Sequence, residues 1–305
     1  MARLARIAIY FRRMFPLQLN LPATAFMFYG FYAMAQATGP GEIRIGADSL
    51  FGFGTFFLSL LLLRLVDELK DEDVDPDVFP DRPLVTGEVR YADVRLLALL
   101  TILSLLALNL GRGLAAEVYL VYFVFFVLSW QWWMFPDRVA PSLALVLLTH
   151  GPLMPLLFAY AYAVYVHTTG EPVVPLQAVV LCGAFWIPML GWEIARKVRA
   201  PDEETDYLSY TRRWGTRRAA AIPLLCVLAA GAGMIALGAG SGFSRIFTGL
   251  HLAAALVAVG FMASFLRRPR RAGLLVLTPM VGYLLVFYVS VLLETWLAGG
   301  APWRS

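Results

Sequence analysis

Long apolar runs separated by short polar segments dominate the chain. A helix needs about 20 mostly apolar residues to cross a bilayer, and nine runs are of about that length. They span 16–37, 48–66, 93–110, 114–133, 139–166, 173–192, 218–238, 244–265 and 272–297. The runs are continuous rather than alternating, so transmembrane β-strands are excluded. The pattern predicts an all-α integral membrane protein with nine transmembrane helices.

The fifth run is the longest and contains Pro141, Pro152 and Pro155. Proline inside a helix removes a hydrogen bond and clashes with the preceding turn, so we expect a kink or an unwound turn in this run. His150 stands just before Gly151 and Pro152. Two interpretations of His150 are open: it is a base, or it satisfies a carbonyl that the kink frees.

The composition narrows the class of protein. Hydrophobic residues make up 60% of the 305 residues, and charged residues make up only 15%. A soluble protein of this size could not bury that much apolar surface and still keep a polar skin. Soluble enzymes, disordered chains and nucleic-acid-binding domains are therefore excluded. We predict one transmembrane domain over residues 1–305, integral to the cell (inner) membrane and surrounded by its lipid bilayer.

The basic residues are distributed unevenly along this pattern. Of the 25 Lys and Arg residues, 21 lie at the N-terminus or in and beside the segments after the second, fourth, sixth and eighth runs. Lys and Arg mark cytoplasmic segments, so we expect a cytoplasmic N-terminus and a C-terminus outside. The net charge of +4 is then a topology signal, and no nucleic-acid partner is expected.

The acidic residues gather on the same predicted side, because 15 of 21 lie in residues 67–93 and 193–206. Asp67, Asp71 and Asp75 are four residues apart, so a helix that continues from the second run would place them on one stripe until Pro76 ends it. Like charges on one stripe destabilise a helix unless a cation neutralises them. Oxygen ligands alone select Mg²⁺ or Mn²⁺. The alternative is a solvated acidic face.

The segment from Asp67 to Asp75, followed by Asp81-Arg82-Pro83-Leu84, resembles the first Asp-rich motif of the UbiA superfamily of intramembrane prenyltransferases. That motif reads Asn-x-x-x-Asp-x-x-x-Asp, so Asp67 stands where the family usually has Asn. Members have nine membrane helices in one bundle, with two cytoplasmic Asp-rich loops after helices 2 and 6. The resemblance thus implies a UbiA-type bundle with cap loops at about 67–92 and 193–217.

The second Asp-rich motif departs from the family pattern. Glu193 stands for its first acid and Asp202 for its third, whereas Arg196 replaces its second Asp. The resemblance still makes Glu193 and Asp202 candidate ligands of a second metal ion. Two interpretations of the bases are open: they hold a diphosphate, or they are only charges of cytoplasmic segments. These bases are Arg196, Lys197 and Arg199.

The resemblance implies a Mg²⁺-dependent transferase that ionises a prenyl diphosphate and passes the prenyl group to an aromatic or lipid-soluble acceptor. The implied metal ligands and catalytic carboxylates are Asp67, Asp71 and Asp75, and Arg82 and Lys70 would bind the diphosphate. A dry pocket would shield the allylic cation. Its candidate residues are Asn20, His150, Trp186 and Trp192; Trp130, Trp132, Trp133 and Phe135 are further candidate walls or interfacial anchors.

Other classes fit the sequence less well. A UbiA-type terpene cyclase shares the ionisation step and is the closest alternative. A CDP-alcohol phosphotransferase would need an Asp-Gly pair, which the chain lacks. An ion transporter, or a non-enzymatic membrane protein that uses the acids as an ion vestibule, should carry acids near the middle of its spans. Glu117 and Glu294 instead lie close to the ends of their runs.

Overall fold

A computed structural model describes residues 2–39, 44–73, 75–204 and 209–299, and these residues form helices and no strand. Within these described ranges, eight helical segments are long and apolar enough to cross a membrane. They are α3 (Ala47–Lys70), α5 (Tyr91–Asn109), α6 (Gly113–Trp130), α8 with α9 (Leu143–His150 and Leu153–Thr169), α10 (Pro175–Ala195), α12 (Thr216–Gly240), α13 (Arg245–Arg267), and η3 with α14 (Gly273–Leu277 and Thr278–Gly299).

The first predicted run forms α2 (Leu17–Ala37), a helix of 21 residues that is not among those eight. Gln18, Asn20 and Gln36 lower its hydropathy. It nevertheless packs within the bundle against α3, α9 and α14. The all-α membrane fold is therefore confirmed, whereas the number of nine transmembrane helices is not.

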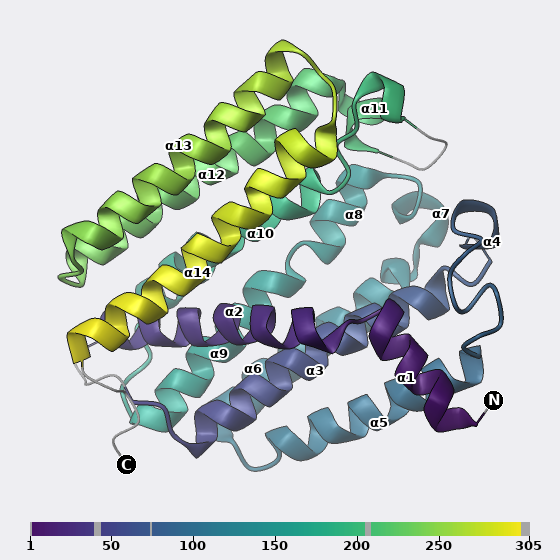
Figure 1. Cartoon of the computed structure of the whole chain (residues 1–305). Coiled ribbons are helices and arrows are strands. Elements are labelled where there is room, and N and C mark those ends of the chain that lie inside the picture. Colours follow the sequence, from purple (N-terminus) through teal and green to yellow (C-terminus); the bar gives the residue numbers. More distant parts are fainter. Residues whose placement is uncertain (1, 40–43, 74, 205–208, 300–305) are drawn as a thin grey trace.

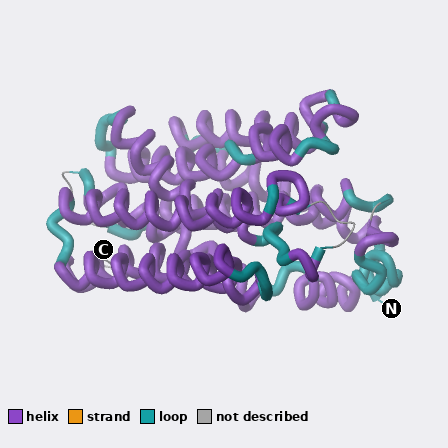
Figure 2. The backbone as a smooth tube through the Cα atoms, turned by 90° about the horizontal axis from the view of Figure 1, so that it is seen from above, coloured by secondary structure: helices purple, strands orange, loops and turns teal. Residues whose placement is uncertain are grey.

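The helices lie side by side with their long axes broadly aligned (Figure 2). An aromatic cluster joins α2, α9 and α10. Phe31 of α2 packs on Phe158 of α9, with 5.2 Å between ring centroids, and on Phe185 of α10, with 5.1 Å between ring centroids. Backbones also approach closely: a Cβ at Gly30 would lie 3.0 Å from the Tyr288 carbonyl oxygen of α14. Small residues permit such approaches, which stabilise helix pairs in membranes.

The kink expected in the fifth run is confirmed. α8 ends at His150, α9 begins at Leu153, and Gly151 and Pro152 lie between them. Pro152 has no amide hydrogen, so it cannot continue the hydrogen-bond ladder of α8.

The predicted helix through Asp75 is wrong. α3 ends at Lys70, and the short helix α4 (Asp75–Val78) begins at Asp75. Carboxylates are unfavourable at the negative end of a helix dipole and favourable at its positive end. Pro76 is tolerated in a first helical turn, so it lies at the start of a helix rather than ending one.

Both segments expected to cap the bundle lie at one end of it. α4 and the short helix α11 (Tyr210–Trp214) are found there together with α1 (Arg3–Arg13), while the far end of α14 lies at the opposite end (Figure 1). α1 is tied to this end by Arg6, whose guanidinium donates to both carboxylate oxygens of Asp93 at 2.6 and 2.9 Å. Arg13 similarly pairs with Glu88.

Arg6→Ala should lower the melting temperature of the detergent-purified protein by several degrees, because Asp93 is buried and would lose its bidentate partner. Arg3→Ala is the matched control, since Arg3 is largely exposed and pairs with the same carboxylate at 3.3 Å. Equal melting temperatures for the two variants would show that the Arg6 pair does not anchor α1.

Candidate functional site

Two regions far apart in sequence bring their charges together at this end of the bundle. Asp67, on the last turn of α3, lies within electrostatic reach of Lys70, Asp71 and Arg196. Lys197 lies within reach of Asp67 and of Glu193. We call this set the charged mouth; its members are Asp67, Lys70, Asp71, Glu193, Arg196 and Lys197.

Asp67 and Asp71 are one helical turn apart at the end of α3, where Asp71 is the capping residue. Neither carboxylate forms a hydrogen bond or an ion pair with any other described residue. Burial and the neighbouring Asp75 raise the pKa of the Asp71 carboxyl. Two adjacent carboxylates that form no ion pair are a suitable donor set for one Mg²⁺, which completes its shell with water and phosphate oxygens.

Asp75 has different surroundings. It is buried and pairs with Arg82, whose guanidinium also lies 4.0 Å from the Glu68 carboxylate. Glu68 has no exposed surface on its side chain and pairs with Arg64 one turn earlier. Within the described residues, no three His, Cys, Asp or Glu side chains lie close enough to hold a metal ion together. The expected stripe of three carboxylates is therefore not assembled.

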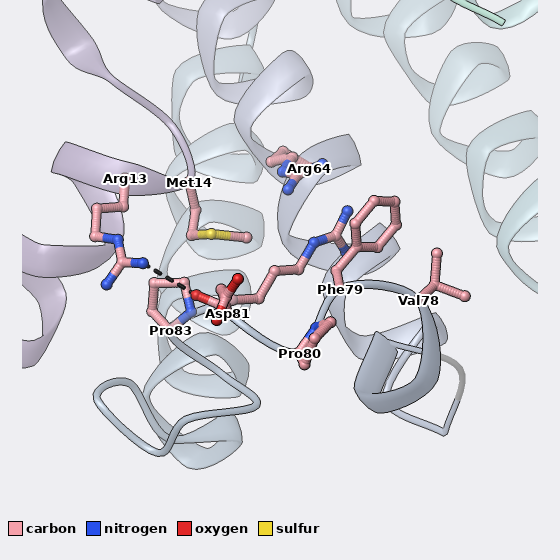
Figure 3. Close-up of a pocket in the computed structure, with 9 residues that line it drawn as sticks. Arg13, Met14, Arg64, Val78, Phe79, Pro80, Asp81 and Pro83 are labelled. Carbon is pink, nitrogen blue, oxygen red and sulfur yellow. Dashed lines mark hydrogen bonds between the residues drawn. The ribbon is translucent and has the colours of Figure 1, made fainter. Parts of the chain in front are cut away.

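Sequence reasoning missed Glu68, although an ionisable residue within an apolar helix is a signal of a specific role. It links the end of α3 to the following segment through Arg82. A cavity of about 430 Å³ lies beside this link, between the end of α1, Arg64 of α3 and residues 78–83 (Figure 3). Arg13 donates to the Asp81 carbonyl oxygen at 3.0 Å across one edge of the cavity.

The second acidic segment is held by its own bases. Arg196 donates to both oxygens of Glu193 at 2.6 and 2.8 Å, and the Lys197 ammonium lies 3.6 Å from the same carboxylate. Burial lowers the pKa of Lys197, while Glu193 opposes that change. Arg199 donates to the carbonyl oxygens of Arg196 and Val198. Asp202 is exposed in the short helix η2 (Pro201–Glu203).

Glu203 was also missed by sequence reasoning. Its carboxylate accepts from the amides of Ala200 and Ala272 at 3.1 and 3.0 Å, which ties η2 to the start of the last helix. No sequence signal distinguishes it from Asp202 and Glu204 beside it. Its partner lies 69 residues away, so only the fold creates this contact.

The candidate pocket residues occupy several environments. The Asn20 amide donates to the Pro16 carbonyl oxygen at 2.9 Å within its own helix. Trp192 lies beneath the Arg196 guanidinium, 5.5 Å from it. Trp186 is half-buried on α10. The structure therefore connects Trp192 to the charged mouth.

His150 contacts the charged mouth through Lys70. Its Nε2 lies 3.3 Å from the Lys70 ammonium, and its Nδ1 lies 2.9 Å from the Thr149 hydroxyl. The Thr149 carbonyl oxygen, in the last turn of α8, accepts from the Ser129 hydroxyl and the Trp133 indole. Both interpretations of His150, as a base and as a partner of a freed carbonyl, remain predictions.

Comparison with known proteins identifies relatives of this arrangement. A sequence model described as the UbiA prenyltransferase family matches residues 23–281. No curated protein sequence matches the chain.

Three solved structures share the fold. A digeranylgeranylglyceryl phosphate synthase has 16% identity and a TM-score of 0.62, with 94% of this chain and 98% of that chain covered. An apo UbiA homologue from Aeropyrum pernix K1 has 15% identity and a TM-score of 0.62, covering 89% and 97%. A UbiA homologue from Archaeoglobus fulgidus bound to GPP and Mg²⁺ has 15% identity and a TM-score of 0.54, covering 92% and 98%.

Glu68→Gln should lower the free energy of unfolding by about 3 kcal/mol, because Arg64 and Arg82 would lose a buried counter-charge. Glu72→Gln is the matched control: Glu72 pairs with Arg95 on the exposed surface, and its loss should cost less than about 1 kcal/mol. Melting curves in detergent measure both changes. A Glu68→Gln protein as stable as Glu72→Gln would show that the buried network contributes nothing.

Proposed function

Because the chain belongs to the UbiA prenyltransferase family, we propose that it is an intramembrane prenyltransferase. It removes diphosphate from a prenyl diphosphate with the help of Mg²⁺ and transfers the prenyl group to an aromatic or lipid-soluble acceptor. The observation that carries this proposal is the pair Asp67 and Asp71, which forms no ion pair with a described residue while Lys70, Arg196 and Lys197 lie within electrostatic reach.

In the charged mouth, the carboxylates would bind the metal ion and the basic residues would bind the diphosphate. Asp67 and Asp71 would hold Mg²⁺, which supplies electrostatic withdrawal of charge from the departing diphosphate. Lys70 is the cation best placed to bind the diphosphate, because it lies within reach of Asp67 and Asp71 but pairs with neither. Arg196 and Lys197 would add further contacts to its oxygens once they separate from Glu193.

Asp75, Glu193 and Asp202 are less suitable metal ligands than Asp67 and Asp71. Asp75 and Glu193 are each neutralised by an arginine, Arg82 and Arg196. Either carboxylate would have to exchange that arginine for a metal ion, while the arginine turned to the diphosphate. Asp202 is exposed and forms no ion pair with a described residue. We therefore propose one metal site at Asp67 and Asp71 as the minimum.

The interior of the bundle suits a short-lived allylic cation. Phe31, Phe158 and Phe185 are fully buried and pack on one another. An apolar interior excludes water, and aromatic faces stabilise cations there. The distribution of Lys and Arg supports an orientation in which the charged mouth opens to the cytoplasm.

Purified protein with Mg²⁺ and geranyl, farnesyl or geranylgeranyl diphosphate should release diphosphate only when a phenolic or lipid acceptor is added. EDTA should abolish release and excess Mg²⁺ should restore it. Release without any acceptor, together with a cyclic hydrocarbon or alcohol, would replace the transferase with a terpene cyclase. Release that EDTA leaves unchanged would refute the metal-dependent mechanism.

Asp71→Ala should reduce diphosphate release about 100-fold or more, because a metal ligand contributes several kcal/mol to the transition state. Asp67→Asn should retain far more activity than Asp67→Ala, since an amide oxygen can still coordinate the ion. Asp73→Ala is the control, as Asp73 is an exposed acid of the same segment. Normal activity of Asp71→Ala, or equal loss from Asp73→Ala, would contradict the assignment.

A further inference from the structure

The groups that contact the Lys70 ammonium directly are uncharged, while Asp67 and Asp71 lie within electrostatic reach of it. The ammonium is 3.2 Å from the centre of the Trp132 ring, 3.3 Å from the Ser129 carbonyl oxygen and 3.3 Å from Nε2 of His150. In the described part of the chain, no carboxylate lies within ion-pair distance of it. A half-buried ammonium held in this way keeps its charge available for an anion.

The direction of each hydrogen bond around Lys70 can be assigned. An ammonium only donates, so Nε2 of His150 must be the accepting nitrogen and Nδ1 must carry the proton. Nδ1 then donates to the Thr149 hydroxyl at 2.9 Å, which donates to the Leu145 carbonyl oxygen at 2.6 Å. The chain of donors ends on the backbone of α8, which fixes the imidazole with its lone pair toward Lys70.

Trp132 reaches Lys70 from a strained turn. Trp132, Trp133 and Met134 have φ angles of 51°, 54° and 64°, which is the left-handed region that residues with a Cβ rarely adopt. Three such residues in succession, none of them glycine, follow the end of α6. Strain of this kind persists where the surrounding contacts require it and often marks a functional site.

Three contacts hold this turn and the end of α8 together. The Trp133 indole donates to the Thr149 carbonyl oxygen at 3.2 Å, and its ring packs edge-on against Phe125. The Ser129 hydroxyl donates to the same carbonyl at 2.8 Å. This carbonyl is available because it lies in the last turn of α8, where carbonyls have no donor within the helix. The turn and the broken helix thus meet at Thr149, beside Lys70.

We infer that Trp132 and His150 are positioning residues that hold the Lys70 ammonium, which forms no ion pair with a described carboxylate, toward the diphosphate of the prenyl substrate. This inference rests on the proposed function. The ring face of Trp132 and the lone pair of His150 attract the ammonium without neutralising it. A carboxylate in either place would compete with the diphosphate for the same cation.

The test is a double-mutant cycle on the full chain in lipid nanodiscs. The probe is geranyl S-thiolodiphosphate, an unreactive allylic diphosphate analogue, in the presence of Mg²⁺, and calorimetry gives its Kd. We expect Lys70→Gln and Trp132→Leu each to weaken binding about tenfold, and the double variant to weaken it about tenfold rather than 100-fold. If Trp132 acts only through Lys70, replacing Trp132 should not change the Kd further once the Lys70 ammonium has been removed.

Two further variants separate positioning from folding. Trp132→Phe keeps a ring face and should recover most of the affinity. Trp296→Leu is the matched control: Trp296 is an exposed residue near the end of α14 opposite the charged mouth, so this change should leave binding unchanged both in the wild type and in Lys70→Gln. Where Trp132→Leu fails to fold, the same cycle with His150→Leu decides the question. Additive losses for Lys70 with Trp132 or His150 would overturn the inference.

The design also separates this inference from the proposed function. A wild-type protein that binds neither the geranyl probe nor its farnesyl and geranylgeranyl counterparts with Mg²⁺ would refute the function itself. A wild-type protein that binds, with a Lys70→Gln variant that binds equally well, would refute the role of Lys70 and its two neighbours while the function stands.

Discussion

The end of α3 at Lys70 is the constraint on which the candidate site depends. Acidic residues continue the sequence beyond this point, and a helix that ran through them would carry its negative charges at the negative end of its own dipole. The chain instead turns after Asp71 and begins α4 at Asp75. Asp67 and Asp71 consequently remain together at the mouth of the bundle. Asp75 enters a buried network with Arg82 and Glu68.

The low dielectric of a membrane bundle requires each buried charge to find a partner. Most charges at this end do so: Glu68 with Arg64, Asp75 with Arg82, and Glu193 with Arg196. Among the described residues of the charged mouth, Asp67, Asp71 and Lys70 form no ion pair; Asp67 is exposed, and Lys70 and Asp71 are partly buried. Charges of both signs that stay unpaired beside each other are suited to a ligand that carries both signs, such as a metal ion bound to a diphosphate.

Much of the fold followed from periodicity and charge. Apolar runs predicted helices because the bilayer sets their length, and Pro152 predicted the break because it lacks an amide hydrogen. The motif around Asp67 and Asp71 indicated the family, and its match over residues 23–281 confirmed that indication. The extent of α3 was mispredicted, because four-residue spacing describes a stripe only if the helix continues. Spacing alone does not show where a helix ends.

Sequence by itself determined which segments enter the membrane and where charge is allowed, since both depend on local transfer free energies. It also placed Asp67, Asp71 and Lys70 together, because they are one turn apart on a single helix. Only the tertiary structure decided what surrounds them. Trp132 and His150 lie 62 and 80 residues beyond Lys70, and they reach it through a left-handed turn and a broken helix. Contacts between distant segments depend on the packing of the whole bundle, which no local pattern records.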